Sequence, residues 1–279
     1  MARSSPSSSR GATRFAYALL LAASALSLIP TIYMVDISLR TADDSFSPML
    51  IAPHVTFANW RAVLSQGNLA GFFFSSALVA LVTVALTLVC VVGLSYAISR
   101  LKIRGGQMML LVVVSALLLP LASLLIPITR LLELLHLTNN YLGLIGPETA
   151  LGIPFGTVIV KAAMDEIPVS LEEAARIDGA GSLGVLLRIV VPLIRPSLLV
   201  VAIWQFLYSW NEFFLALVIM TRDSLKPLPL APLFYQGPFM TDPGKLFAIL
   251  TLIAVVPMVA YIVLQRWFVA GLMEGSVKG

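Results

Sequence analysis

Six long apolar runs decide which solvent this chain can fold in. They cover residues 16–38, 72–98, 108–132, 141–162, 198–220 and 246–269. About 20 consecutive apolar residues cross the hydrocarbon core of a bilayer as a helix, which satisfies its own backbone hydrogen bonds. Strand-like alternation is absent from these runs. The sequence therefore predicts an all-α, polytopic membrane protein with six transmembrane helices.

The composition agrees with lipid as the main solvent and partner. Charged residues make up 11% of the chain, whereas a soluble domain carries about 25%. The net charge of +4 is spread along the sequence, so we expect no nucleic-acid partner. The single cysteine, Cys90, is expected to be a small buried apolar residue. The two histidines, His54 and His136, lie far apart in the sequence and predict neither a metal site nor a catalytic triad.

The distribution of Lys and Arg predicts the orientation of the chain. With the N-terminus in the cytoplasm, twelve basic residues fall on the cytoplasmic side and six on the other. The cytoplasmic set is Arg3, Arg10, Arg14, Arg100, Lys102, Arg104, Lys161, Arg176, Arg188, Arg195, Arg266 and Lys278, and the outer set is Arg40, Arg61, Arg130, Arg222, Lys226 and Lys245. We therefore expect cytoplasmic tails at 1–15 and 271–279 around a membrane domain at 16–270.

The first apolar run also has features of a secretory signal peptide. Residues 1–14 are basic and Ser-rich, and Ala23-Ser24-Ala25 fits a small-residue cleavage site. The apolar run continues to Val35, beyond the core of an ordinary signal peptide, which favours an uncleaved first span.

The longest inner connection, residues 163–197, is predicted to form a helix, a turn and a second helix. Pro168 ends the preceding span, and Ser170 with Glu173 fits a capping box. Gly179 permits a turn. Pro192 and Pro196 end the second helical piece and start the next span. Taken singly, these residues require no more than local structure.

The spacing within this segment resembles the signature of permease subunits of ATP-binding-cassette importers. The matching residues are Glu173, Ala174, Ala175, Asp178, Gly179, Ile189 and Pro192, with Val191 in place of the leucine that usually precedes the proline. The resemblance implies that 163–197 is a coupling helix docking on a separate ATPase. It also implies two ATP-binding subunits, a second permease and an extracytoplasmic solute-binding protein as partners, in a bacterial inner membrane.

Other segments resemble the maltose-type carbohydrate permeases within that group. They are Tyr96–Arg100, Leu119-Pro120, Ser209–Phe213 and the tail from Gly271 to Gly279. The resemblance implies import of a carbohydrate. It further implies contact with the binding protein through Gln236, Gly237, Thr241 and Asp242, and entry of the tail, including Glu274, Gly275 and Lys278, into the ATPase interface. A flexible loop and a frayed end are the alternatives.

Polar residues gather inside the fifth predicted span. Gln205, Tyr208 and Glu212 fall at helical spacing on one face, with Asn211 beside it. An acidic residue within a span is costly and usually faces a cavity or a partner. These residues are candidates to line the substrate pathway, and hydrogen bonding between helices is the alternative. In the fourth span, Gly152 and Gly156 have the small-xxx-small spacing of close helix contacts.

No phosphate-binding loop occurs in the sequence. Pro243-Gly244-Lys245 lacks the first glycine and the following hydroxyl residue of that motif. We therefore expect no enzymatic site and no cofactor on this chain, with ATP and Mg²⁺ on the partner ATPase. The alternative function is an ion-coupled secondary transporter, in which Glu212 would be a coupling residue.

Overall fold

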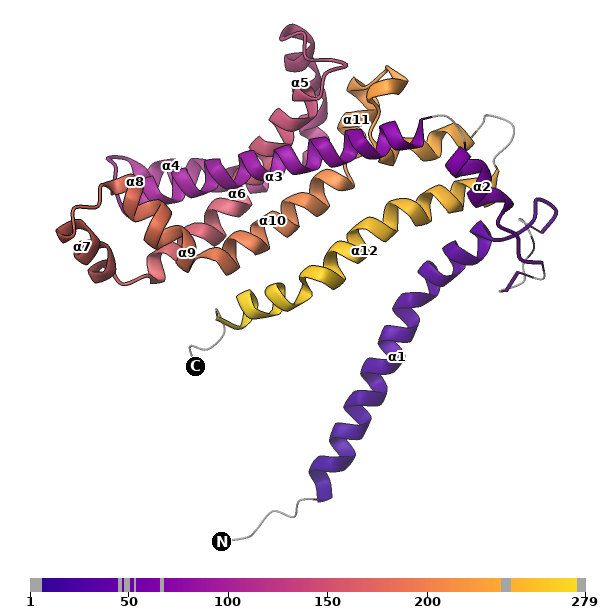
Figure 1. Ribbon diagram of the computed structural model, residues 1–279, viewed down its shortest axis with the longest axis horizontal. Coiled ribbons are helices and arrows are strands. Elements are labelled where there is room, and N and C mark those ends of the chain that lie inside the picture. The colour runs from indigo at the N-terminus through magenta and orange to yellow at the C-terminus, as the bar shows by residue number, and fades with distance from the viewer. Residues whose placement is uncertain are drawn as a thin grey trace. The chain divides into compact units, whose positions relative to one another are not determined.

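The computed structural model describes residues 7–44, 47, 51–52, 54–65, 68–236 and 242–274, and these residues are mainly helical (Figure 1). Among them, four helices are long and apolar enough to cross a membrane: α1 (Ser7–Ser38), α3 (Leu69–Ser99), α6 (Leu142–Glu166) and α12 (Pro243–Glu274). Two bent helix pairs bring the total to six if each pair is one span. Apart from isolated bridges such as Arg40 with Val55, the described residues form no strand. The predicted all-α class is confirmed.

The third apolar run, 108–132, is not one straight helix. It is divided into α4 (Gly106–Ser115), a 3₁₀ turn η1 (Ala116–Leu118) and α5 (Leu121–Leu134), and the two arms meet at 107°. Leu119 has an extended backbone, with φ −80° and ψ 123°. The cause is Pro120, because the proline ring disfavours helical geometry in the residue before it.

The fifth apolar run, 198–220, is also broken. Helix α10 (Arg195–Trp210) ends ten residues before the predicted boundary, and the short helix α11 (Phe214–Ile219) follows after a gap. At its other end, α10 meets the helical stretch Ser182–Leu193 at an angle of 78°. The remaining elements are α2 (Ala58–Ser65), α7 (Val169–Ile177), α8 (Ser182–Val185), the π-helical η2 (Leu186–Val190), α9 (Val191–Leu193), η3 (Asp223–Leu225) and η4 (Leu228–Tyr235).

The chain divides into two compact units. The first comprises residues 1–67 and 232–255, and the second residues 68–231 and 256–279. Within the first unit, a buried Arg40 organises the loop after α1. Its guanidinium pairs with Asp36 at 2.6 Å and donates to the carbonyl of Ser47 at 2.7 Å, while Asn59 of α2 donates to the Arg40 carbonyl at 2.8 Å. The side chain and the backbone carbonyl of Arg40 thus join the end of α1 to the start of α2.

The second unit is built on a layer of three helices, α3, α6 and α10, which lie side by side (Figure 1). Gly156 makes this contact close. A Cβ atom at Gly156 would lie 2.8 Å from Val91 of α3 and 3.1 Å from Val201 of α10. The contact predicted from the spacing of Gly152 and Gly156 is confirmed, because only a small side chain fits where the helices meet. Cys90 is exposed on α3, so its predicted burial is wrong.

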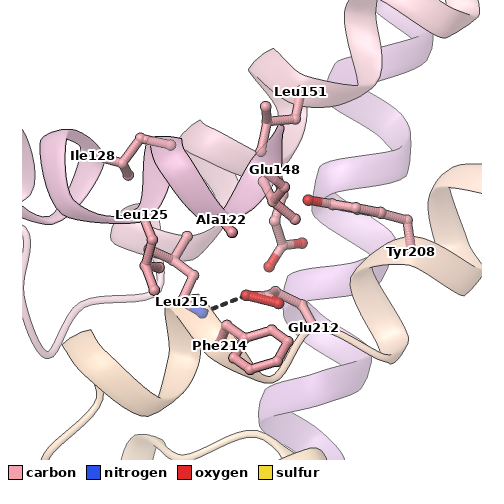
Figure 2. A pocket seen from close by; sticks show the side chains of 10 residues that line it. Ala122, Leu125, Ile128, Glu148, Leu151, Tyr208, Glu212, Phe214 and Leu215 are labelled. Carbon is pink, nitrogen blue, oxygen red and sulfur yellow. Dashed lines mark hydrogen bonds between the residues drawn. The ribbon is translucent and has the colours of Figure 1, made fainter. Parts of the chain in front are cut away.

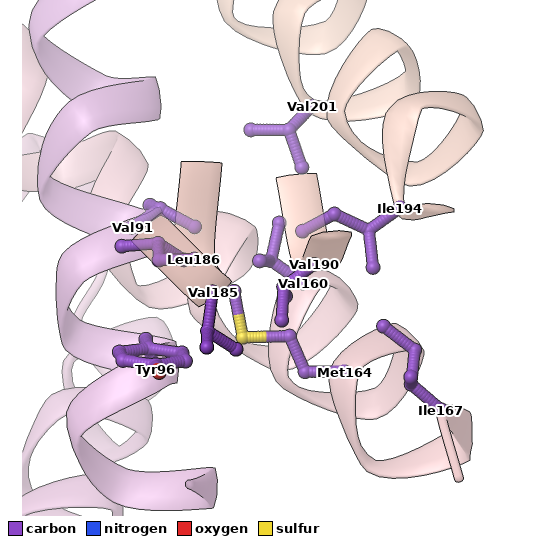
Figure 3. Packing of buried hydrophobic residues seen from close by; sticks show 10 residues of the cluster. All are labelled: Val91, Tyr96, Val160, Met164, Ile167, Val185, Leu186, Val190, Ile194 and Val201. Carbon is purple, nitrogen blue, oxygen red and sulfur yellow. The ribbon is translucent and has the colours of Figure 1, made fainter. Parts of the chain in front are cut away.

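One end of this layer holds an apolar core that joins it to the 163–197 segment (Figure 3). The core's buried members come from α3, α6, α8, η2 and α10 and the residues that flank them: Val91, Tyr96, Val160, Met164, Ile167, Val185, Leu186, Val190, Ile194 and Val201. Since residues before and after Gly179 share this core with three long helices, the segment is part of the packed unit and not a free loop.

We expect Gly156→Leu to destabilise the protein and Gly146→Leu to leave it nearly unchanged. Both glycines lie on α6. A Cβ atom at Gly146 would have no neighbour within 4 Å, whereas one at Gly156 would lie 2.8 Å from Val91. Overpacking of a closed contact costs about 1–3 kcal/mol. Thermal unfolding of the purified variants in detergent compares them. Equal unfolding temperatures would contradict the close three-helix contact.

Candidate functional site

The 163–197 segment is a helix, a turn and a second helical stretch, as its sequence predicts. Helix α7 ends at Ile177 with two reversed hydrogen bonds, from Gly179 N–H to the Arg176 carbonyl at 3.0 Å and from Ala180 N–H to the Ala175 carbonyl at 2.9 Å. This is a Schellman motif, which requires a left-handed residue after the helix. Gly179 supplies it with φ of +85°. Its role is therefore conformational, since open space surrounds the position of a Cβ.

The predicted capping box at the start of α7 is wrong. The helix begins at Val169, directly after Pro168, and no side chain caps it. Ser170 therefore lies inside the first turn. Pro168 is the N-cap residue, with φ −58° and an extended ψ of 129°, and its side chain has no hydrogen-bonding group to cap the helix. Glu173 is exposed, and the buried acidic residue of this turn is its neighbour, Glu172.

The other residues of the motif divide between surface and core. Ala174, Asp178 and Gly179 are exposed with Glu173, whereas Ala175 packs against the apolar core and Ile189 and Pro192 are half-buried. Pro192 lies in the first turn of α9, and the preceding turn is π-helical, with Val191 N–H bonded to the Leu186 carbonyl. The prediction that this helical piece ends at Pro192 is wrong, because the helical stretch continues through Pro192 to Leu193 and the chain turns at Ile194. Pro196 lies in the first turn of α10, where the next span was predicted to start.

Large apolar side chains are exposed on the surface of the 163–197 segment. Ile177 is 87% exposed and Leu183 67%, and Val169, Leu171 and Leu187 are exposed with them. These side chains flank the exposed motif residues Glu173, Ala174 and Gly179. An apolar surface of this kind, beside charged groups and at the end of a packed unit, is typical of a protein–protein contact.

Sequence reasoning missed the partner of Glu172. The guanidinium of Arg100, the residue that follows α3, lies 2.7 Å from the Glu172 carboxyl group, and both side chains are buried. The sequence placed Arg100 among the cytoplasmic basic residues and in a segment that resembles the family, but it predicted no partner for its side chain. The signal that was available is an acidic residue on the apolar side of a short helix, which requires a cation nearby.

A second feature of the unit is a cavity of about 400 Å³ among α5, α6, α10 and α11 (Figure 2). Its walls are mostly apolar, from Leu121, Ala122, Leu125, Ile128, Leu151, Phe214 and Leu215, and its polar residues are Glu148, Tyr208 and Glu212. Figure 2 shows the carboxyl groups of Glu148 and Glu212 pointing toward each other. The Glu148 carboxyl group also accepts a hydrogen bond from Ser209.

The four polar residues predicted to line a pathway are only partly brought together. Tyr208 and Glu212 face the cavity, although not on one continuous helix, because α10 ends at Trp210 before Glu212. Gln205 is buried between helices and donates to the Glu148 carbonyl at 3.2 Å. Asn211 is exposed and bonds back to the Leu207 carbonyl at 2.7 Å. The prediction of one shared helical face is therefore wrong for Glu212.

Glu148 is the cavity residue that sequence reasoning missed. It is 1% exposed and lies two turns into α6, a helix that the sequence predicts as a span. The rule that singled out Glu212, that an acidic residue within a span is costly, applies equally to Glu148. Glu212 has a structural role as well, since its carboxyl group accepts the N–H of Leu215 at 2.5 Å in the first turn of α11.

The loop and tail residues predicted to contact partners lie mostly outside the described residues. Gly237, Thr241, Gly275 and Lys278 are outside them, and of Glu274 only its place at the end of α12 is described. Gln236 is exposed. Asp242 pairs with Lys245 at 2.9 Å at the start of α12.

This fold and these two features define a polytopic helical membrane protein, with a cavity among its helices and an exposed apolar contact surface at one end. The chain belongs to the family of binding-protein-dependent transport system inner membrane components, which it matches over residues 90–274. It is therefore a multi-pass membrane component of a transport system. The family does not favour the ion-coupled secondary transporter considered from the sequence.

Similar proteins are transport permeases. The chain is 34% identical over 255 residues to the sulfoquinovosyl glycerol transport system permease protein of Agrobacterium fabrum, covering 90% of this chain and 89% of that protein. It is 29% identical over 254 residues to the trehalose transport system permease protein of Mycobacterium tuberculosis, covering 90% and 93%. These relatives favour a transport role over an enzymatic one.

The fold also matches a solved structure. A chain in the crystal structure of a bacterial ABC transporter involved in the import of the acidic polysaccharide alginate superposes with a TM-score of 0.81 at 21% identity. The match covers 96% of this chain and 100% of that one. At this identity the similarity supports the fold alone.

We expect Glu212→Ala to lower the stability of the protein, because the first turn of α11 then loses the acceptor of the Leu215 N–H. Loss of such a cap costs about 1 kcal/mol. Glu212→Gln keeps an oxygen acceptor and is expected to unfold near the wild-type temperature. Thermal unfolding in detergent compares the three proteins, and a Glu212→Ala variant as stable as the wild type would show that the hydrogen bond contributes nothing.

Proposed function

We propose that this chain is one of two permease subunits of an ATP-driven importer, working with two copies of an ATP-binding subunit and a solute-binding protein. The exposed face of the 163–197 segment carries this proposal. Its apolar residues, Ile177 and Leu183 among them, surround a helix end fixed by the left-handed Gly179. Such a surface fits a groove on a soluble partner, and its apolar core ties it to the membrane helices.

ATP and Mg²⁺ belong to the partner in this proposal, and the chain itself binds no cofactor. The sequence has no phosphate loop that would hold a nucleotide here. The chain's part is mechanical: closure of the ATP-binding subunits pushes on the 163–197 segment, and the segment moves the helices. The coupling is the free energy by which nucleotide state changes the preference between two arrangements of the permease.

The orientation follows from the same assignment. The 163–197 segment faces the cytoplasm of a bacterium, where ATP is available, and the positive-inside count places both termini on that side. The loop from Gln236 to Asp242 then faces the binding protein outside the inner membrane, and the tail from Glu274 to Lys278 reaches toward the ATPase interface.

A carbohydrate is the proposed solute. Relatives named for sulfoquinovosyl glycerol and trehalose transport support this class. In the chain's own residues, Tyr208, Glu148 and Glu212 place a phenol ring and two carboxyl groups in one cavity. Aromatic faces and hydrogen-bond acceptors are the groups that sugar rings and hydroxyls need. We propose that this chain contributes half of the pathway, with Tyr208 and Glu212 lining it.

Purification from the native host in mild detergent, with mass spectrometry of the bound proteins, tests the assembly. We expect an ATP-binding subunit, a second permease and a solute-binding protein. The recovered binding protein then identifies the solute by screening sugars against it. Recovery of this chain alone, repeated under crosslinking, would overturn the proposal in favour of a transporter without an ATPase.

We expect Gly179→Asp to abolish most import while Gly181→Asp preserves it. Both glycines are exposed with open space around a Cβ, but only Gly179 has a positive φ, so only there does a side chain strain the end of α7. Import by the complete transporter should fall by about tenfold or more at Gly179, within the range of allosteric couplings. The measurement is solute uptake at matched levels of inserted protein. Normal uptake by Gly179→Asp would count against docking at this turn.

A further inference from the structure

The end of α3 holds the 163–197 segment at two separate points, on either side of Gly179. Tyr96 donates its hydroxyl to the carbonyl of Ser182 at 3.2 Å, across 86 positions of sequence. One turn later, Arg100 pairs with Glu172 of α7 at 2.7 Å. Tyr96 of α3 and Arg100, the residue directly after α3, both belong to the Tyr96–Arg100 stretch, for which the proposed function gives no role.

Arg100 joins three elements through one guanidinium group. Its Nε approaches the carboxyl group of Glu172 as an ion pair, without the alignment of a hydrogen bond. Its Nη2 donates to the carbonyl of Ile167 at 2.7 Å and to the carbonyl of Met164. These two carbonyls lie at the end of α6, where carbonyls lose their i+4 partners, although the Met164 carbonyl also accepts the N–H of Ile167 at 3.1 Å. Arg100 thus donates hydrogen bonds to the carbonyls at the end of α6 and also pairs with a carboxylate on α7.

This contact resists separation because it is buried. The Arg100 side chain is 8% exposed and that of Glu172 3%. Parting the two would leave a buried charge without a partner, which is among the costliest changes in a protein interior. By contrast, the neighbouring pair of Lys161 and Asp165 lies 46% exposed at its carboxylate and is held more loosely.

Apolar packing stiffens the same joint. Tyr96 is buried in one cluster with Met164 of α6, Val185 of α8 and Val190 of η2 (Figure 3). The ring of Tyr96 therefore fixes the second half of the segment by packing as well as by its hydroxyl group. Movement of α7 and α8 relative to α3 would break the ion pair and open this core together.

We propose that Arg100 and Tyr96 are positioning residues that make α3 a lever for the 163–197 segment. The inference rests on the proposed function and adds to it the contact through which motion of the segment is transmitted to α3. Along the chain, α7 and α8 are joined only to α6 before them and, through η2 and α9, to α10 after them, so without this joint their motion would reach α3 only through those helices. With it, α3 moves as one body with α7, and α3 lies along both α6 and α10.

The first test measures solute imported per ATP hydrolysed by the complete reconstituted transporter. Arg100→Gln and Glu172→Gln should each lower this ratio by about tenfold or more, within the range of allosteric couplings. The double variant should be no worse than either single variant, because the two residues act as a unit. Arg100→Lys keeps the charge and should recover part of the ratio. Tyr96→Phe removes only one hydroxyl and should lower the ratio less.

The control is Arg104→Gln, an exposed arginine in the loop after α3. It should leave the ratio unchanged. A merely structural role for Arg100 predicts a different pattern, in which assembled complex, ATP hydrolysis and import fall together and their ratio stays constant. That pattern, or an unchanged ratio in well-assembled Arg100→Gln complexes, overturns the proposal.

The second test measures the joint directly, as the distance between α3 and α7. Spin labels at Val89→Cys on α3 and Val169→Cys on α7, in a Cys90→Ser background, report the distance between the two helices. Both label sites are exposed. The distance should be the same with and without ATP in the complete transporter, and it should broaden in Arg100→Gln. A distance that changes with ATP in the parent protein overturns the lever.

The two tests separate this inference from the proposed function. If no ATP-binding subunit purifies with the wild-type chain, the proposed function is wrong, and the inference about α3 is wrong as well. Alternatively, the complex forms and Gly179→Asp blocks import, but Arg100→Gln changes neither the solute imported per ATP hydrolysed nor the distance between α3 and α7. In that case only the lever is wrong.

Discussion

The close contact of α3, α6 and α10 supports every other feature of the second unit. In lipid there is no hydrophobic gain from bringing two apolar helices together, so helices associate where small residues allow backbones to approach and polar groups to bond. Gly156 provides that approach, with Val91 and Val201 on either side. Gln205 and Ser209 of α10 then reach Glu148 of α6. The same contact brings the ends of α3 and α6 together, where Arg100 meets Glu172.

The two candidate sites lie toward opposite ends of this three-helix layer. Near the start of α6, the breaks after Trp210 and at Leu119 turn α11 and α5 around a cavity that holds Glu148 and Glu212. At the end of α6, the chain leaves the layer as α7, turns at Gly179 and returns through the apolar core. A displacement applied to α7 therefore has a packed route toward the cavity.

Much of this architecture could be predicted from the sequence, because the signals are local. Apolar runs mark the spans, and the spacing around Gly179 and Pro192 marks the helix, turn and return. Whether a proline bends or breaks a helix depends on packing, so the sharp turn at Leu119 could not be foreseen. Glu173 fitted a local capping rule, but no side chain caps α7. The acidic residue with a buried partner is Glu172, and local rules could not find that partner because Arg100 is far away in sequence. Glu148 was within reach of the rule applied to Glu212.

The central claim is that the exposed face of the 163–197 segment docks on an ATP-binding subunit. The most direct measurement places a photoreactive amino acid at Ile177, which is 87% exposed, and in a matched protein at Leu118, which is 83% exposed in the bent third run. After irradiation in the native host, mass spectrometry identifies the crosslinked proteins. We predict an ATP-binding subunit attached at Ile177 and none at Leu118. An equally exposed Ile177 that captures no such subunit, or capture from both positions alike, would contradict the account.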